Sequence, residues 1–372
     1  MIASYLLVRE FQHNKEISPL PTSRRGVPTS HKATEGQSDM TDKLNVQNYF
    51  AYGLFASTFL VFILAVVQLV EKSSFGGLWY FLGERNLTLS LPGIAKSSLN
   101  GNEFLRPYST FSHPNSMGGF YLVLYFLINW FQNNFNVMLP ARRSINEGGS
   151  LPKQDIEESP IRQAQGDKTI KILFYAIQIL SLFLIVLSFS KVAIGTFVFL
   201  SFINLLRDKA YKGCIICFFA RIFVLLIILF FGLLSVGDPY TIEKRLFLTR
   251  QAVEVFIKYP LIGSGLGTNI IAQSKTILSI PGKFTDTTQP VHNIYLMLLS
   301  ETGLIGVGLM VYTIFNFRKY LSNWQKLPIM AISAILITGF FDHYWLTLSQ
   351  NIALSSFVFA LIFLKWRNQA IS

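Results

Sequence analysis

Long apolar runs alternate with polar stretches along most of the chain, and the runs contain few charged residues. A bilayer core about 30 Å thick needs roughly 20 apolar residues for each helical crossing. Eight runs approach that length, so the pattern predicts an all-α, polytopic integral membrane protein with about eight transmembrane helices. The predicted spans are residues 48–71, 116–135, 170–189, 192–206, 214–236, 294–315, 329–345 and 350–365.

The third and fourth spans form one apolar tract that is interrupted only around Lys191. This tract is too long for a single crossing, so we expect a tight hairpin of two helices with Lys191 at its tip. Composition agrees with a membrane protein, because 51% of the 372 residues are hydrophobic, 34 are Phe, and the mean hydropathy is +0.42. Such a composition excludes a soluble domain of this size.

The formal net charge is +12, which by itself could indicate nucleic acid binding. Lys and Arg lie in the loops between spans rather than on one soluble face, so no nucleic-acid partner is predicted. By the positive-inside rule, the basic loops 207–213 and 316–328 face the cytoplasm together with both termini. The connections expected on the outer side are residues 72–115, 190–191, 237–293 and 346–349.

Two polar segments flank or interrupt the membrane domain, which is expected to extend over residues 48–365. Residues 1–47 are predicted to be a disordered cytoplasmic tail, and residues 136–169 a flexible cytoplasmic insertion. Cys214 and Cys217 lie at the cytoplasmic end of the fifth span. A single CxxC pair is weak evidence for zinc or redox chemistry, so ordinary buried thiols are expected.

The connection 237–293 is the longest polar excursion between spans, and its first part has helical periodicity. The apolar positions predict an amphipathic helix that lies on the outer leaflet. Arg250, Glu254 and Lys258 form a polar stripe on it, while Arg245 points roughly 140° away. The apolar stripe consists of Ile242, Leu246, Thr249, Val253, Phe256 and Ile257.

Pro260 is expected to end this helix, and the GSGLG sequence at 263–267 follows directly. Its glycines allow a tight turn and a close approach of the backbone to a ligand. No βαβ context surrounds it, so it is not a dinucleotide-binding fingerprint.

Several chemically active residues fall at the predicted outer ends of different spans. They imply a basic, histidine-containing pocket that opens outward. Such a pocket suits an anionic lipid head group, because Arg and Lys stabilise phosphate oxygens and His exchanges a proton near neutral pH. The residues are Arg106, His113, Asn115, Lys191, His292, Asn293, Asp342 and His343. The sequence lacks DxD, HExxH and P-loop patterns, so neither a metal-bound nucleotide sugar nor ATP is indicated.

Four groups of residues resemble a known family when they are considered together. The HN-x9-GLIG sequence from His292 to Gly306 follows the basic helix, Pro260 and GSGLG. RPYSTFSHPN precedes the second span, SFSK lies at the hairpin tip, and FDHYWLTLSQ lies near the end. Over about residues 104–365, this combination resembles the O-antigen ligase and O-antigen polymerase family of bacterial integral-membrane glycosyltransferases.

The resemblance implies a GT-C-like multi-pass protein of the bacterial inner membrane with an outward-facing site. Its implied reaction is metal-independent transfer of a glycan from an undecaprenyl-diphosphate carrier, without a cofactor, to lipid A core, a growing polysaccharide or a protein. His292 would activate or orient the acceptor hydroxyl, and Arg245, Arg250 and Lys191 would hold the diphosphate. The remaining pocket would be lined by Arg106, His113, Asn115, Asn293, Asp342 and His343.

Two features differ from the family pattern. The hairpin-tip position is usually Arg, and Lys191 lacks the bidentate fork that suits a phosphate. Members also tend to have additional spans before the position of residue 48. One alternative is therefore a shortened, inactive member.

A different class of protein is also compatible with the sequence. In a transporter, Glu301, Asp342 and His343 would form a proton or ion relay, although no internal repeat supports this reading. A non-catalytic assembly or anchoring protein is a third alternative. The sequence does not separate a ligase from a polymerase.

Overall fold

A computed structural model describes residues 31–91, 93–99, 101–138, 158–207, 214–234, 240–277, 289–317 and 328–370. The loops 207–213 and 316–328 and most of the insertion 136–169 therefore lie largely outside the described residues, as do residues 1–30. The described chain is predominantly helical, and it confirms an α-helical membrane protein. The all-α expectation needs one small correction, because β1 (Lys96–Leu99) and β2 (Asn102–Leu105) pair as an antiparallel hairpin.

The chain divides into two compact units. One comprises residues 1–59 and 135–177, and the other comprises residues 60–134 and 178–372. α2 (His31–Glu71), α4 (Pro114–Met138) and α5 (Glu158–Leu187) each contribute to both units, and every candidate site residue lies in the second. That unit also contains α3 (Leu78–Phe81), α6 (Lys191–Arg207), α7 (Ile215–Leu234), α8 (Tyr240–Lys258), α9 (Asn269–Ile277), α10 (Ile294–Phe317), α11 (Ile329–Gly339), α12 (Tyr344–Thr347) and α13 (Ser349–Ala370).

Four helical segments within the described residues are long and apolar enough to cross a bilayer. They are Tyr49–Glu71, Lys168–Leu187, Ile215–Leu234 and Ile294–Asn316. The structure therefore supports a membrane protein but not the full set of eight crossings. The predicted seventh span, 329–345, ends as a helix at Gly339, and α11 is about 16 Å long, too short to cross alone.

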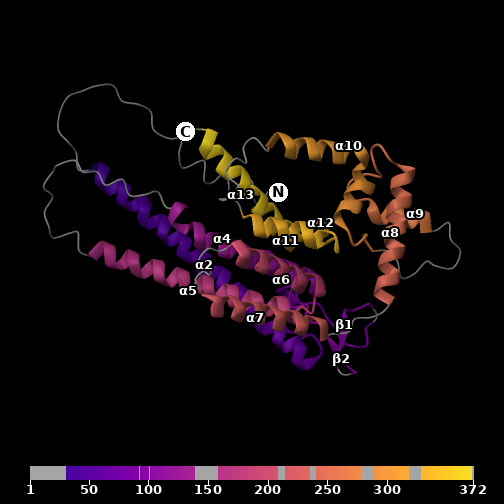
Figure 1. Cartoon of the computed structure of the whole chain (residues 1–372), viewed down its shortest axis with the longest axis horizontal. Coiled ribbons are helices and arrows are strands. Elements are labelled where there is room, and N and C mark those ends of the chain that lie inside the picture. The colour runs from indigo at the N-terminus through magenta and orange to yellow at the C-terminus, as the bar shows by residue number, and fades with distance from the viewer. Residues whose placement is uncertain are drawn as a thin grey trace. The chain divides into compact units, whose positions relative to one another are not determined.

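The sixth predicted span is not one continuous helix. Gly303, inside α10, has φ 63° and ψ −169°, and Figure 1 shows the two parts of α10 running in different directions. The backbone N–H of Leu304 donates to the carbonyl of Pro260 at 2.9 Å, and that of Ile305 donates to Leu261 at 3.0 Å. These bonds satisfy N–H groups that the break removes from the helical ladder.

The GSGLG segment forms hydrogen bonds with the broken part of α10 rather than an open ligand site. The N–H groups of Ser264 and Gly265 donate to the carbonyls of Ser300 and Glu301, both at 2.9 Å. A Cβ at Gly263 would lie 2.3 Å from the Glu301 carbonyl carbon. The glycine therefore allows close backbone approach, as the sequence predicted, but the partner is α10.

The predicted amphipathic helix is present as α8, and it has a buried face in addition to the predicted lipid-facing stripe. Ile242, Leu246 and Ile257 of the predicted stripe are exposed. A second face is buried through Leu248 and Ala252, and Ala252 packs against Val291 and Met297. α8 is thus attached to α10 on one side, while the predicted stripe remains available to lipid.

The segment between α2 and α4 is held by buried polar bonds. Gln68 Nε2 donates to Glu84 Oε1 at 2.8 Å. Gln68 Oε1 accepts the backbone N–H groups of Tyr108 at 2.9 Å and Ser109 at 2.7 Å. These bonds fix the segment that carries Arg106 and leads into α4. The helix begins at Pro114, and proline is favoured at the first helical position.

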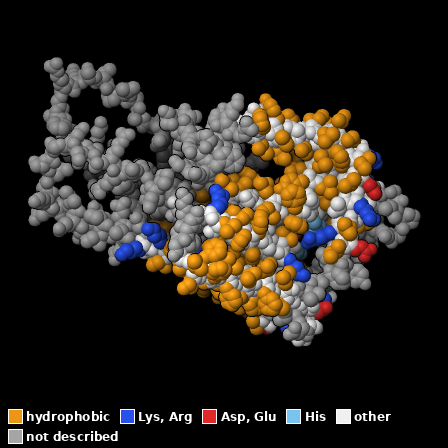
Figure 2. All heavy atoms as spheres, viewed as in Figure 1, with side chains coloured by type: hydrophobic (Ala, Val, Ile, Leu, Met, Phe, Trp, Pro, Cys, Tyr) orange, Lys and Arg blue, Asp and Glu red, His pale blue; other side chains and the backbone are white. Residues whose placement is uncertain are grey.

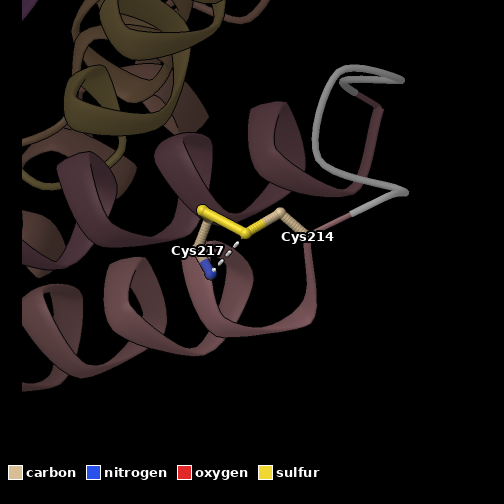
Figure 3. The surroundings of a disulfide bond; sticks show 2 residues. All are labelled: Cys214 and Cys217. Atoms are coloured by element: carbon tan, nitrogen blue, oxygen red, sulfur yellow. Dashed lines mark hydrogen bonds between the residues drawn. A yellow bond between two sulfur atoms is a disulfide. The ribbon is translucent and has the colours of Figure 1, made fainter.

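Cys214 and Cys217 correct the expectation of buried free thiols. They form a disulfide across the first turn of α7 (Figure 3), Cys214 is half-buried and Cys217 is exposed. The three-residue spacing at a helix start brings the Cα atoms to 5.3 Å, which is within the range that a disulfide spans.

Hydrophobic side chains dominate the described surface of the protein. Figure 2 shows them over most of the coloured area of the face in view, with Lys, Arg, Asp and Glu confined to small groups. Exposed large apolar residues occur on α7, where Ile216 is 82% exposed, and along the second part of α10. Such a surface is stable in lipid rather than in water.

Candidate functional site

Two segments far apart in sequence supply the centre of the site. His292 lies two residues before the start of α10, and Asp342 and His343 lie in the turn between α11 and α12. These three residues offer donor atoms that all lie within 4.8 Å of one another. The rings of His292 and His343 meet edge to face, with centroids 5.1 Å apart.

A chain of hydrogen bonds fixes the carboxylate of Asp342. Asn115 Nδ2 donates to Asp342 Oδ2 at 3.0 Å, and Arg106 Nη2 donates to Asn115 Oδ1 at 2.6 Å. Arg106 is anchored in turn by the Ser188 carbonyl, which accepts from Nε at 3.1 Å and from Nη2 at 2.8 Å. The Asn115 amide therefore transmits the position of Arg106 to Asp342.

Local bonds orient the two central histidines. The His343 N–H donates to Asp342 Oδ1 at 2.9 Å, and His343 Nδ1 is bonded to the Thr347 hydroxyl at 2.7 Å. His292 Nδ1 is buried and has no hydrogen-bond partner among the described residues. His292 is therefore the histidine of this pair whose Nδ1 has no hydrogen-bond partner among the described residues.

Asn293 holds the backbone beside His292. Its Oδ1 accepts the N–H groups of Tyr295 and Leu296, both at 2.9 Å, so it caps the start of α10. Its Nδ2 donates to the Phe340 carbonyl at 3.2 Å, which ties this cap to the turn that carries Asp342. These bonds hold the start of α10 against the turn that carries Asp342.

The site stabilises an ionised carboxylate beside neutral imidazoles. Burial lowers the pKa of His292 to about 4, although the nearby Asp342 opposes this shift. Burial alone would raise the pKa of Asp342, but the neighbouring His343, His292 and His113 and the Asn115 hydrogen bond outweigh it and hold that pKa below its ordinary value. At neutral pH, Asp342 is charged and His292 can accept a proton.

His113 and His343 are also neutral at pH 7. Burial lowers the pKa of His113 to about 3 and lowers that of His343 as well. His113 Nδ1 accepts the backbone N–H of Asn115 at 3.1 Å. This bond requires the unprotonated nitrogen, and it gives His113 a part in orienting Asn115.

The structure separates the three cations assigned to diphosphate binding. Arg245, on α8, donates from Nη1 to the Phe341 carbonyl at 3.4 Å, and its buried Nε has no hydrogen-bond partner among the described residues. Its charge lowers the pKa of both His292 and His343. Arg250 and Lys191 are exposed, and no described contact joins either to the His–Asp cluster.

Some contributing residues were not identified from the sequence. Lys244 also lowers the pKa of His292. On the predicted helix, only Arg245 stood apart from the polar stripe, and Lys244 had no predicted role. Thr347 and the Ser188 carbonyl hold His343 and Arg106, respectively. Gln68, a polar residue inside an apolar span, was a usable signal, because such residues face protein rather than lipid.

Both carboxylate oxygens of Glu301 accept backbone hydrogen bonds near the start of α9. Its Oε2 accepts the N–H of Gly267 at 3.0 Å, and its Oε1 accepts the N–H of Asn269 at 3.1 Å. A carboxylate at this position caps the start of α9 and complements the helix dipole. These bonds favour a structural role over the proton relay of the transporter alternative.

The His–Asp cluster is also the group within the described residues that most resembles a metal site. Two imidazoles and a carboxylate can bind Zn²⁺ or Fe²⁺. However, both Asp342 oxygens already accept hydrogen bonds, His343 Nδ1 is engaged by Thr347, and Arg106 and Arg245 add two positive charges nearby. The donor set permits a metal ion, and the two positive charges oppose its binding.

Together, the apolar helices and this His–Asp–Arg cluster define an α-helical membrane protein with a polar, largely buried candidate site. Residues 176–311 match the family model described as O-antigen ligase. The chain therefore contains a domain of the O-antigen ligase family. The matched segment includes Arg245 and His292 and ends before Asp342. No curated protein and no solved structure matches the chain.

Proposed function

We propose that this protein is a lipid-linked glycan transferase of the ligase or polymerase type. Its donor would be a glycan on undecaprenyl diphosphate, and its acceptor lipid A core, a growing polysaccharide or a protein. The site would face outward from the bacterial inner membrane. The observation that carries the proposal is the neutral His292, with an unpartnered Nδ1, beside the ionised Asp342 and Arg245.

In the proposed reaction, the acceptor hydroxyl oxygen attacks the anomeric carbon of the donor glycan. The bond between that carbon and the diphosphate oxygen breaks, and undecaprenyl diphosphate leaves with the bonding electrons. His292 takes the hydroxyl proton as a general base. The carboxylate of Asp342 stabilises the imidazolium that forms, because opposite charges within a few ångströms attract strongly in a buried site.

Arg245 is the group best suited to the leaving diphosphate. Its Nε is buried and has no bond to another described residue, so a phosphate oxygen would supply the missing acceptor. Arg106 is already committed to Asn115 and Ser188, and it instead supports Asp342. The proposed division is therefore proton transfer by His292, charge neutralisation by Arg245, and positioning by Arg106 and Asn115.

The test is transfer of a radiolabelled glycan from undecaprenyl diphosphate by the purified full-length protein in detergent containing EDTA. Wild-type protein should transfer glycan, and His292→Ala should lose at least about a hundredfold in rate, the lower range for a general base. Activity that EDTA abolishes and Zn²⁺ restores would contradict the metal-free mechanism. Absence of transfer by the wild-type protein, with every acceptor class supplied, would contradict the proposed function.

Arg245 and Arg250 provide a matched pair for the same assay, because both are arginines on α8. Arg245→Gln should reduce kcat/KM by roughly 10- to 100-fold, as expected for loss of a charge-assisted hydrogen bond worth about 1.5–3 kcal/mol. Arg250→Gln should remain within about threefold of wild type because its side chain is exposed. Equal effects of the two substitutions would contradict the assignment of the diphosphate to Arg245 rather than Arg250.

A further inference from the structure

Residues 259–267, here called the glycine loop, present apolar side chains outward although they belong to the longest polar connection between the predicted spans. Leu261 is 61% exposed, Ile262 is 72% exposed and Leu266 is 75% exposed. The loop contains no Asp, Glu, Lys or Arg. In water, exposure of three neighbouring large apolar side chains would be unfavourable.

Backbone polar groups of the glycine loop are hydrogen-bonded to protein, as a bilayer environment requires. The break in α10 at Gly303 and the glycine loop exchange bonds in both directions, from Ser264 and Gly265 to α10 and from Leu304 and Ile305 back to the loop. In a bilayer, non-helical backbone is tolerated only where protein satisfies its polar groups. This reciprocal pairing provides such partners without using the outward side chains.

The absence of side chains at two glycines makes the pairing possible. A Cβ at Gly303 would lie 2.4 Å from the Leu261 carbonyl oxygen, and a Cβ at Gly263 would overlap the backbone of Glu301. Both glycines have positive φ, a conformation that other residues adopt only with strain. The loop is therefore held rigidly against α10, with its apolar side chains directed away from it.

The surface of the glycine loop is continuous with that of a candidate membrane span. Leu304 and Ile305, which bond to the loop, are each more than half exposed. The same is true of Leu309, Val311, Tyr312, Ile314 and Phe315 along the remainder of the Ile294–Asn316 span. The apolar surface of the span therefore extends onto the loop without a charged interruption.

We propose that the glycine loop is embedded in the bilayer and that its partner is the acyl-chain region of the membrane. Leu261, Ile262 and Leu266 insert among lipid tails, while the broken backbone of α10 supplies hydrogen bonds behind them. The position of this connection in the sequence suggested that it is exposed to water. On this proposal, part of the connection between α8 and α10 lies in lipid instead. This inference does not depend on the proposed glycan transfer.

The experiment places a nitroxide label on Ile262→Cys in full-length protein that also carries Cys214→Ser and Cys217→Ser. The protein is reconstituted into vesicles of phosphatidylcholine and phosphatidylglycerol. Relaxation by oxygen, which concentrates in hydrocarbon, is compared with relaxation by a water-soluble nickel chelate. Glu254→Cys on the exposed face of α8 is the water-facing control, and Ile314→Cys on α10 is the lipid-facing control.

The label on residue 262 should favour oxygen over nickel by a ratio close to that of residue 314 and at least about threefold above that of residue 254. A ratio equal to that of residue 254 would overturn the proposal. Protection from both reagents would also overturn it, because it would indicate cover by protein, such as a second copy of this chain.

A second measurement does not depend on replacing the cysteines. Ile262→Trp in the otherwise native chain should lose additional tryptophan fluorescence, relative to the parent protein, in vesicles of brominated phosphatidylcholine. Glu254→Trp is the matched control and should show little additional quenching. Equal additional quenching at the two positions would overturn the proposal.

Discussion

His292 differs from an ordinary surface histidine in the pH range over which it can accept a proton. With its pKa lowered to about 4, it is neutral throughout the range in which a histidine of pKa 6.5 would begin to charge. A base with a lowered pKa remains competent as the pH falls, and it is lost only when the pH passes through the lowered value.

This shift leads to a prediction for the pH dependence of kcat/KM for glycan transfer. Between pH 7 and pH 5, kcat/KM should change little, because His292 stays deprotonated. Below about pH 4 it should fall as His292 takes up a proton. An acidic limb centred near pH 6.5 would contradict the buried environment of His292 or its role as base.

A control for this measurement is the circular dichroism of the protein at each pH. Helical content that is unchanged from pH 7 down to the lowest pH assayed, below pH 4, would assign the loss of rate to titration rather than unfolding. The burial of His113 and His343 makes this control necessary, because protonation of those imidazoles at low pH also opposes the folded state.

Residue identities at the site were largely recognisable from the sequence, but their division of roles was not. His292, Asp342 and His343 were predicted to share a pocket, and the structure brings them together. Arg245 and Arg250 were assigned the same role, yet only Arg245 contacts the turn that carries Asp342. A five-residue separation on a helix places them on different faces, and packing decides which face meets the site.

At the scale of elements, the main feature of α10 is the break in the helix at Gly303. Gly303 occupies a left-handed conformation where a side chain would meet the backbone of the glycine loop. Gly308, in the following part of the same helix, has open space around the position of a Cβ. The two glycines therefore have opposite requirements, although both lie in the GLIGVG segment.

The expected result for Gly303→Ala is a loss of stability, because strain of roughly 1–3 kcal/mol arises at such a position. Gly308→Ala should be neutral or slightly stabilising, since alanine is favoured over glycine in a helix by about 0.5–1 kcal/mol. Thermal unfolding in detergent, followed by tryptophan fluorescence, compares the two variants. Equal unfolding temperatures would indicate that the break in α10 does not contribute to stability.

Part of the structure around the break in α10 was predictable from the sequence. Apolar content predicted a helix near residues 294–315, and Pro260 with its following glycines predicted a turn. The pairing between them was not predictable, because nothing local indicates which backbone a glycine approaches. The reciprocal bonds depend on α8, which holds the loop at the correct position beside α10.

At the scale of the whole molecule, the outcome that matters most is the side of the membrane on which each connection lies. The positive-inside rule places the connection 237–293 outside and the insertion 136–169 inside. This orientation would give the site access to a lipid-linked donor on the outer leaflet.

In right-side-out membrane vesicles, trypsin added outside should cleave within residues 268–290 and leave residues 142–169 intact. Vesicles opened with detergent provide the control in which both segments become accessible. Fragments detected by mass spectrometry distinguish the two segments. Cleavage of 142–169 alone in sealed vesicles would reverse the predicted orientation and exclude an outward-facing site.

The sequence by itself determined the helical membrane class, the position of α8 and the residue types of the site, because hydrophobic content and periodicity are local properties. Tertiary structure alone decided that Asn115 reaches Asp342 across 227 residues of sequence. It also decided that the glycine loop completes the backbone of α10. The physical reason is that a hydrogen bond depends on the distance and direction between its groups, and only the packing of distant segments sets these.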